Sequence, residues 1–143
     1  MNFAALFAWL LTVGGGLVLL MIWIIEYDKD FQSTAATRLP VPVISTHALL
    51  ALGGLTVWLS YILVDDDQLA WTSIAILAVV AALGLIMGAR WVTVYRTFAK
   101  PGPSLASRRL VPPERNFPVP LVIAHGLLGL TTIVLVIMAT VSS

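Results

Sequence analysis

Two histidines are the residues whose type and spacing could support chemistry. His47 lies in the stretch PVPVISTHALLAL (40–52), and His125 lies in the closely similar stretch PVPLVIAHGLLGL (118–130). The chain has no other histidine. Each follows its second proline by five residues, which places it about 7–8 Å below the start of a helix. We therefore expect the imidazoles to share one depth, where neutral imidazole is a good ligand for haem iron, copper or zinc.

The composition indicates that both histidines sit in membrane-spanning helices. The chain of 143 residues is 59% hydrophobic and 10% charged, with a mean hydropathy of +0.99. A soluble domain has about 25% charged residues. Apolar runs long enough to cross a bilayer predict an all-α, single-domain integral membrane protein. We expect an up-and-down bundle of four helices, with spans at about 3–25, 42–64, 69–95 and 120–141.

An internal repeat extends beyond the histidines. One pattern in the first hairpin recurs in the second at a constant offset: Gly16-Leu17, Trp23 and Tyr27 match Gly84-Leu85, Trp91 and Tyr95. Two similar hairpins inserted in the same orientation predict a pseudo-twofold axis along the membrane normal. Such an axis would bring the histidines to equivalent places. The tryptophans and tyrosines are typical of an aromatic belt at the membrane boundary.

The charges predict the orientation. All eight Lys and Arg residues lie on or next to loops 26–40 and 96–118, and the opposite side carries the acidic turn 65–67. The positive-inside rule then makes these loops cytoplasmic and both termini external, in a bacterial-type inner membrane. Because topology explains the positive charge, we expect no nucleic-acid partner. The chain has no cysteine, which excludes disulfide exchange and cysteine-ligated clusters.

Residues near the histidines match what a flat, acidic cofactor needs. One turn after each histidine stands a small residue, Ala51 or Gly129, which leaves room along the helix. Haem propionates require cationic or hydrogen-bonding partners near the membrane surface. Three arginines are candidates for this role: Arg90 at about histidine depth, and Arg38 and Arg115 ahead of the repeated motifs.

On these two histidines and four spans, the chain resembles small four-helix membrane b-type cytochromes, such as haem-carrying anchor subunits of quinone oxidoreductases and cytochrome b561-like proteins. The resemblance implies one haem b with His47 and His125 as axial ligands, and electron exchange with a quinone or a partner subunit. The cytochrome b561-like pattern has more histidines, for two haems. This sequence offers ligands for at most one.

Two other interpretations remain open. Histidines near helix starts can serve only as polar contacts between helices, and duplication would copy them. The chain would then be a non-catalytic accessory or assembly subunit of a larger respiratory or photosynthetic membrane complex, without a cofactor. The histidines could also bind a metal ion or a quinone without haem. Both alternatives share the lipid bilayer and neighbouring membrane subunits as partners.

Overall fold

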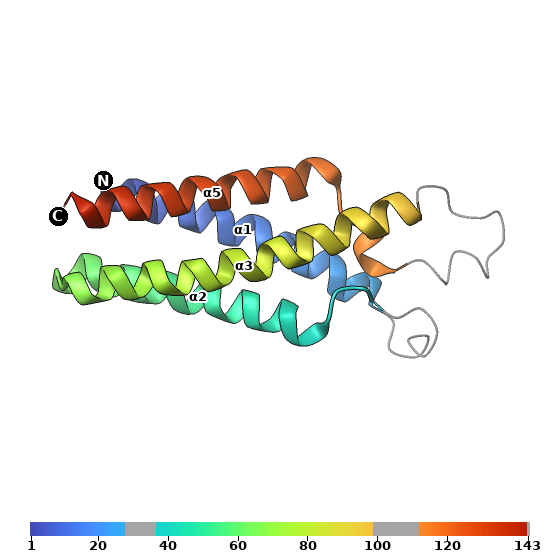
Figure 1. Cartoon of the computed structure of the whole chain (residues 1–143), viewed down its shortest axis with the longest axis horizontal. Coiled ribbons are helices and arrows are strands. Elements are labelled where there is room, and N and C mark those ends of the chain that lie inside the picture. The colour runs from blue at the N-terminus through green and yellow to red at the C-terminus, as the bar shows by residue number, and fades with distance from the viewer. Residues whose placement is uncertain (28–36, 99–111, 143) are drawn as a thin grey trace.

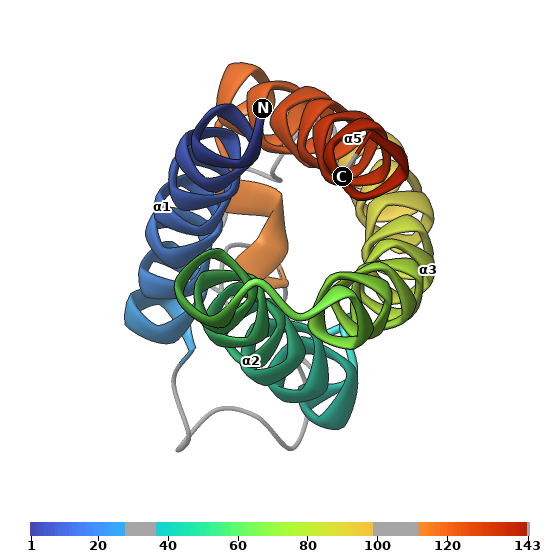
Figure 2. The ribbon, with the colours of Figure 1, turned by 90° about the vertical axis from the view of Figure 1, so that its left-hand side faces the viewer.

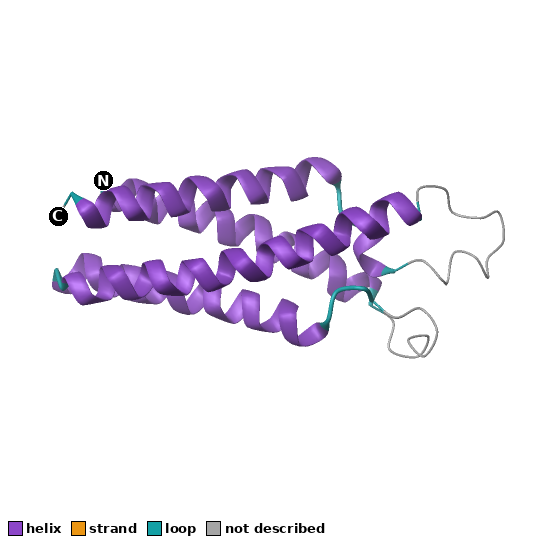
Figure 3. Cartoon of the chain, viewed as in Figure 1, coloured by secondary structure: helices purple, strands orange, loops and turns teal. Residues whose placement is uncertain are grey.

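The computed structural model describes residues 1–27, 37–98 and 112–142, and this part of the chain is helical, with no strand (Figure 3). All four long helices fall within three residues of the predicted spans, and a short 3₁₀ helix precedes the last of them. The elements are α1 (Asn2–Glu26), α2 (Val41–Val64), α3 (Asp67–Thr97), η2 (Pro113–Asn116) and α5 (Val119–Val141).

Local sequence explains where the helices begin and end. α2 and α5 each carry a proline in the first two positions, Pro42 and Pro120, where its missing N–H breaks no helical hydrogen bond. α2 ends at Asp65 in the left-handed conformation, with φ 58°. The next residue, Asp66, caps α3 by accepting a hydrogen bond from the Gln68 backbone N–H at 2.9 Å. The acidic turn is thus a helix stop followed directly by a helix start.

The four helices run up and down, so both termini and the Asp65–Asp66 turn share one end of the bundle (Figure 1). We call this the termini end, and the opposite end, with residues 37–40 and 112–118, the loop end. Contacts between helices concentrate in two pairs, α1 with α5 and α2 with α3. Each pair joins one helix from each sequence repeat. The pairs contact each other less, and Figure 2 shows them as opposite walls.

The packed core lies toward the termini end. Trp9, Trp58, Tyr61 and Val136 are the largest apolar side chains at its centre, and each is at most 1% exposed. Two of the indoles hydrogen-bond across the helix pairs: Trp9 Nε1 donates to the Ala51 carbonyl at 3.2 Å, and Trp58 Nε1 donates to the Asn2 carbonyl at 3.4 Å. This core closes one end of the bundle and leaves the other end for the histidines.

The outward faces of the helices are apolar. Side chains such as Phe3, Ile25, Leu49 and Leu63 are at least 70% exposed on the isolated chain. Exposed apolar surface on this scale is unfavourable in water and is expected where helices contact lipid. All four long helices are long and apolar enough to cross a membrane. The protein is a multi-pass, four-helix membrane protein in contact with the bilayer.

A buried carboxylate joins the two loops at the loop end. Glu114 in η2 is fully buried. Its Oε1 accepts a hydrogen bond from the Arg38 backbone N–H at 2.6 Å, and its Oε2 accepts one from the Thr37 hydroxyl at 3.0 Å. Charge-assisted bonds of this kind are stronger than neutral ones. Glu114 therefore fixes the segment before α2 against the segment before α5.

Candidate functional site

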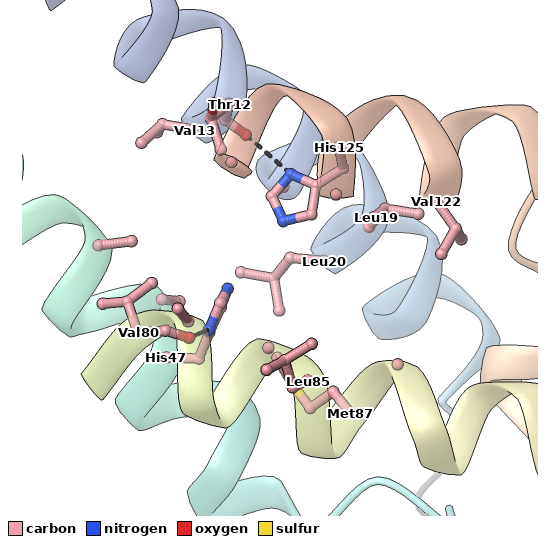
Figure 4. Close-up of a pocket in the computed structure, with 18 of the residues that line it drawn as sticks. Thr12, Val13, Leu19, Leu20, His47, Val80, Leu85, Met87, Val122 and His125 are labelled. Atoms are coloured by element: carbon pink, nitrogen blue, oxygen red, sulfur yellow. Dashed lines mark hydrogen bonds between the residues drawn. The ribbon is translucent and has the colours of Figure 1, made fainter. Parts of the chain in front are cut away.

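The structure brings the two histidines together inside the bundle. His47 is the seventh residue of α2 and His125 is the seventh residue of α5, so both lie at one depth. Their ring centroids are 6.3 Å apart and the ring planes meet at 68°. Figure 4 shows one nitrogen of each ring turned toward the space between them. The two histidines thus share one depth, as the sequence predicts, and the structure adds that their rings face each other.

A backbone carbonyl on a neighbouring helix holds each ring. His47 Nδ1 lies 3.0 Å from the Val80 carbonyl oxygen on α3, and His125 Nδ1 lies 3.0 Å from the Thr12 carbonyl oxygen on α1 (Figure 4). Because a carbonyl oxygen only accepts, each hydrogen bond requires the proton on Nδ1. In the neutral ring Nε2 then carries the free lone pair. Metal-binding histidines are commonly oriented by such a bond on the other ring nitrogen.

Glycines leave space for both rings. A Cβ added to Gly16 on α1 would lie 2.9 Å from His125 Cε1, and one added to Gly84 on α3 would lie 3.3 Å from His47 Cε1. Both distances are shorter than ordinary carbon contacts. The repeated Gly-Leu pattern therefore marks the two places where an imidazole packs against a helix backbone. Each histidine is fixed by a carbonyl and a glycine of the same neighbouring helix.

The histidines line a cavity of about 680 Å³ between the two helix pairs. Its volume is within the range of small-molecule and cofactor sites, roughly 300–1,000 Å³. Apart from the two imidazoles and a few hydroxyl and indole groups, aliphatic side chains and glycines form its wall. Such a wall favours a large, flat, mostly apolar ligand.

The spacing of the rings fits two ligands of one metal ion. Each metal–imidazole bond is about 2.0 Å and each nitrogen lies roughly 1.1 Å from its ring centre, so two rings on opposite sides of one ion would have centroids about 6.2 Å apart. The observed separation is 6.3 Å. Within the described residues, no group of three or more His, Cys, Asp or Glu side chains could hold a metal. A porphyrin supplies four nitrogen ligands of its own, so two protein ligands suit haem better than bare zinc or copper.

Of the other predicted site residues, the two small ones lie at the site and the three arginines do not line it. Ala51 and Gly129 both line the cavity. Arg90 is exposed and donates to the Arg38 carbonyl at 3.0 Å, and the Arg38 side chain is exposed. Arg115 donates to the Phe98 carbonyl at 2.9 Å and lies 4.3 Å from the Tyr95 ring centre. All three are at the loop end.

The prediction that Arg90 lies at histidine depth is wrong. Gly84 contacts His47, and Arg90 is six residues further along α3, about 9 Å closer to the loop end. α3 runs seven residues past Arg90, to Thr97, so the helix extends beyond the start of α2. Arg90 therefore contacts the loop before α2.

Sequence reasoning missed several contributors to the site. Trp23 and Trp91, which fitted an interfacial belt, both line the cavity, and Trp23 is only 7% exposed. The sequence did contain a signal for them. Each tryptophan follows by seven residues the glycine that contacts a histidine, and residues seven apart lie on one helix face. The carbonyl partners of the histidines carry no side-chain signal. Nothing in the sequence distinguishes the buried Glu114 from a solvated loop carboxylate.

No protein-family model, curated protein or solved structure matches this chain. These comparisons therefore do not identify a b-type cytochrome. The geometry of the site carries the functional argument.

Proposed function

We propose that the protein is a membrane electron-transfer subunit that holds one b-type haem between His47 and His125. The observation that carries this proposal is the pair of opposed imidazoles, 6.3 Å apart, with each Nδ1 engaged by a carbonyl. This arrangement leaves both Nε2 lone pairs facing the space between the rings. When bound, haem supplies reversible one-electron chemistry at its iron.

The protein's part is ligation, orientation and exclusion of water. The Val80 and Thr12 carbonyls fix the ring tautomers and raise the basicity of the ligating nitrogens. The aliphatic wall lowers the local dielectric, and the core around Trp9 and Trp58 closes the cavity toward the termini end. Ligand identity, hydrogen bonding and burial are the means by which a protein tunes a haem potential.

The orientation rule supports a location in a bacterial-type inner membrane, with the loop end cytoplasmic and the termini outside. The site would then lie in the cytoplasmic leaflet. Its electron partner would be a quinone in the bilayer or a neighbouring subunit of a redox complex. A single site at one depth does not cross the bilayer, so this partner completes the electron path.

The test is a reduced-minus-oxidised visible spectrum of the detergent-purified protein. We expect the sharp α-band of a six-coordinate b-type haem at about one haem per chain, lost in His47→Ala and in His125→Ala. His47→Asn separates ligation from packing, because its amide still donates to a neighbouring carbonyl but does not replace the imidazole. Retained folding with a lost spectrum is expected for this variant.

Restoring a ligand provides a second test. In His125→Gly the space of the ring is empty, and added free imidazole should restore the six-coordinate spectrum. A colourless wild-type protein that co-purifies with larger subunits would overturn the haem proposal. It would favour the accessory-subunit interpretation, in which the histidines only hydrogen-bond to neighbouring helices.

A further inference from the structure

The cavity wall differs between the two repeats toward the loop end. Among the residues of α1 that line the cavity are Gly16, which contacts His125, Leu20 and Trp23, spaced i, i+4 and i+7. On α3 the equivalent positions are Gly84, Gly88 and Trp91, which also line the cavity. Residues with this spacing form one stripe along a helix. The two stripes match at their first and last positions and differ in the middle.

The middle position of each stripe, Leu20 on α1 and Gly88 on α3, determines how much space the cavity has along that helix. Leu20 projects into the cavity beside the two imidazoles, on the side toward the loop end (Figure 4). Gly88 has no side chain, and a Cβ added there would meet no atom within 4 Å. Leu85 and Met87 on α3 also line the cavity, as Leu17 and Leu19 do on α1. At the position between the glycine and the tryptophan of each stripe, α3 has no side chain, whereas Leu20 occupies the corresponding place on α1.

The two tryptophans also differ in their hydrogen bonding. Trp23 Nε1 donates to the Thr37 hydroxyl at 3.3 Å. In the second repeat, Arg115 replaces this threonine, and its guanidinium donates to the Phe98 carbonyl instead. Trp91 Nε1 is buried and has no hydrogen-bond partner in the part of the chain that the structure describes. A buried donor without a partner is rare and points to a missing acceptor.

We propose that Trp91 anchors the cavity ligand: when the ligand binds, the indole turns its buried N–H toward the cavity and donates it to a carboxylate oxygen of that ligand. For haem, the acceptor is one of the two propionates, and the propionate edge faces the loop end along α3. This inference rests on the proposed function. It assigns the anchoring role to a residue that lines the cavity. The arginines at the loop end do not line the cavity, and Arg90 and Arg115 donate hydrogen bonds to backbone carbonyls instead.

The experiment compares two porphyrins that differ only in their carboxylates. The wild-type protein, produced without haem, is titrated with haem b and with its dimethyl ester, and binding is followed by Soret absorbance. Trp91→Phe removes the N–H and keeps an aromatic ring beside Tyr95. We expect this variant to bind haem b about tenfold more weakly, as for loss of a hydrogen bond to a charged group. Its affinity for the dimethyl ester should stay at the wild-type value.

Trp23→Phe is the matched control, because the N–H of Trp23 is bonded within the protein. It should change the two affinities by the same factor. The inference is overturned if Trp91→Phe weakens both porphyrins equally or neither. In that case a bis-histidine spectrum in the wild type leaves the proposed function standing. A wild type that takes up neither porphyrin overturns both.

Discussion

The α1/α5 pair and the α2/α3 pair hold their histidines in the same way but differ around them. In both pairs a carbonyl and a glycine of the partner helix position the ring. In the α1/α5 pair the Thr12 and Thr132 hydroxyl oxygens are also 3.0 Å apart, whereas the equivalent positions in the other pair are Val80 and Gly54. The features that position the imidazoles are thus shared, and the surrounding packing has diverged.

The divergence separates two tasks. The α1/α5 pair contributes a side chain that projects into the cavity, Leu20, and a tryptophan with a partner inside the protein. The α2/α3 pair contributes the open wall at Gly88 and the unpartnered Trp91 N–H. A ligand held by symmetric histidines would therefore have only one orientation in which its polar edge meets a free donor.

The largest effect is expected from Gly88→Leu, which gives α3 the side chain that α1 has. The leucine would occupy the open wall, and haem content should fall at least tenfold, because overpacking a ligand site also displaces neighbouring side chains. The measurement is the haem-to-protein ratio after purification. Gly53→Leu is the control, since Gly53 is exposed, faces open space and does not line the cavity. Full haem content in Gly88→Leu would show that the open wall is not used.

The glycines that contact the histidines should respond unequally. In Gly16→Ala the new methyl meets His125 at 2.9 Å, and unfolding free energy should fall by about 1–3 kcal/mol. In Gly84→Ala the contact is 3.3 Å, and the better helix propensity of alanine, about 1 kcal/mol, should offset most of the cost. Thermal unfolding followed by circular dichroism measures both. Gly14→Ala is the reference without a new contact, because a methyl group added there has no atom within 4 Å. Equal losses of unfolding free energy in Gly16→Ala and Gly84→Ala would contradict this prediction.

The loops should also prove unequal. The position equivalent to Glu114 in the first repeat is an alanine, so the buried carboxylate belongs to one repeat only. Glu114→Ala leaves the Thr37 hydroxyl and the Arg38 N–H without this acceptor, and should cost about 1–3 kcal/mol. Glu26→Ala, which loses one exposed bond to Asn116, should stay within about 0.5 kcal/mol. Comparable melting temperatures for the two variants would argue against a structural role for Glu114.

The smallest effect is expected from Thr132→Val. It removes the hydroxyl contact with Thr12 and keeps the shape of the side chain. Hydrogen bonds between membrane helices contribute about 0.6 kcal/mol on average, so the shift in melting temperature should be slight. A loss above about 2 kcal/mol would mean that this contact holds the α1/α5 pair together. The exposed Thr56→Val, whose hydroxyl bonds only within α2, is the matched control.

Sequence was sufficient for the fold, because long apolar runs, prolines at helix starts and an acidic turn are local signals. It also placed the histidines at one depth, since their offset within two similar stretches is fixed. The facing of the rings could not be predicted, because helices that are apolar on all sides give no inward direction. The prediction for Arg90 failed because the sequence does not encode how far the end of α3 extends past the start of α2. Trp91 could not be singled out, since its missing partner depends on where Arg115 goes in three dimensions.

The pairing of the helices bears on how the protein assembles. Each histidine is bonded to the other helix of its own pair, so neither bond joins the two pairs. A metal ion bound by both imidazoles would make that connection. The binding free energy would then add to the cohesion of the fold, by about 4 kcal/mol when free ligand is 1,000 times its dissociation constant. The bound ligand would then act as a link between the helix pairs at the depth of the histidines, in addition to the indole hydrogen bonds that join the pairs in the core.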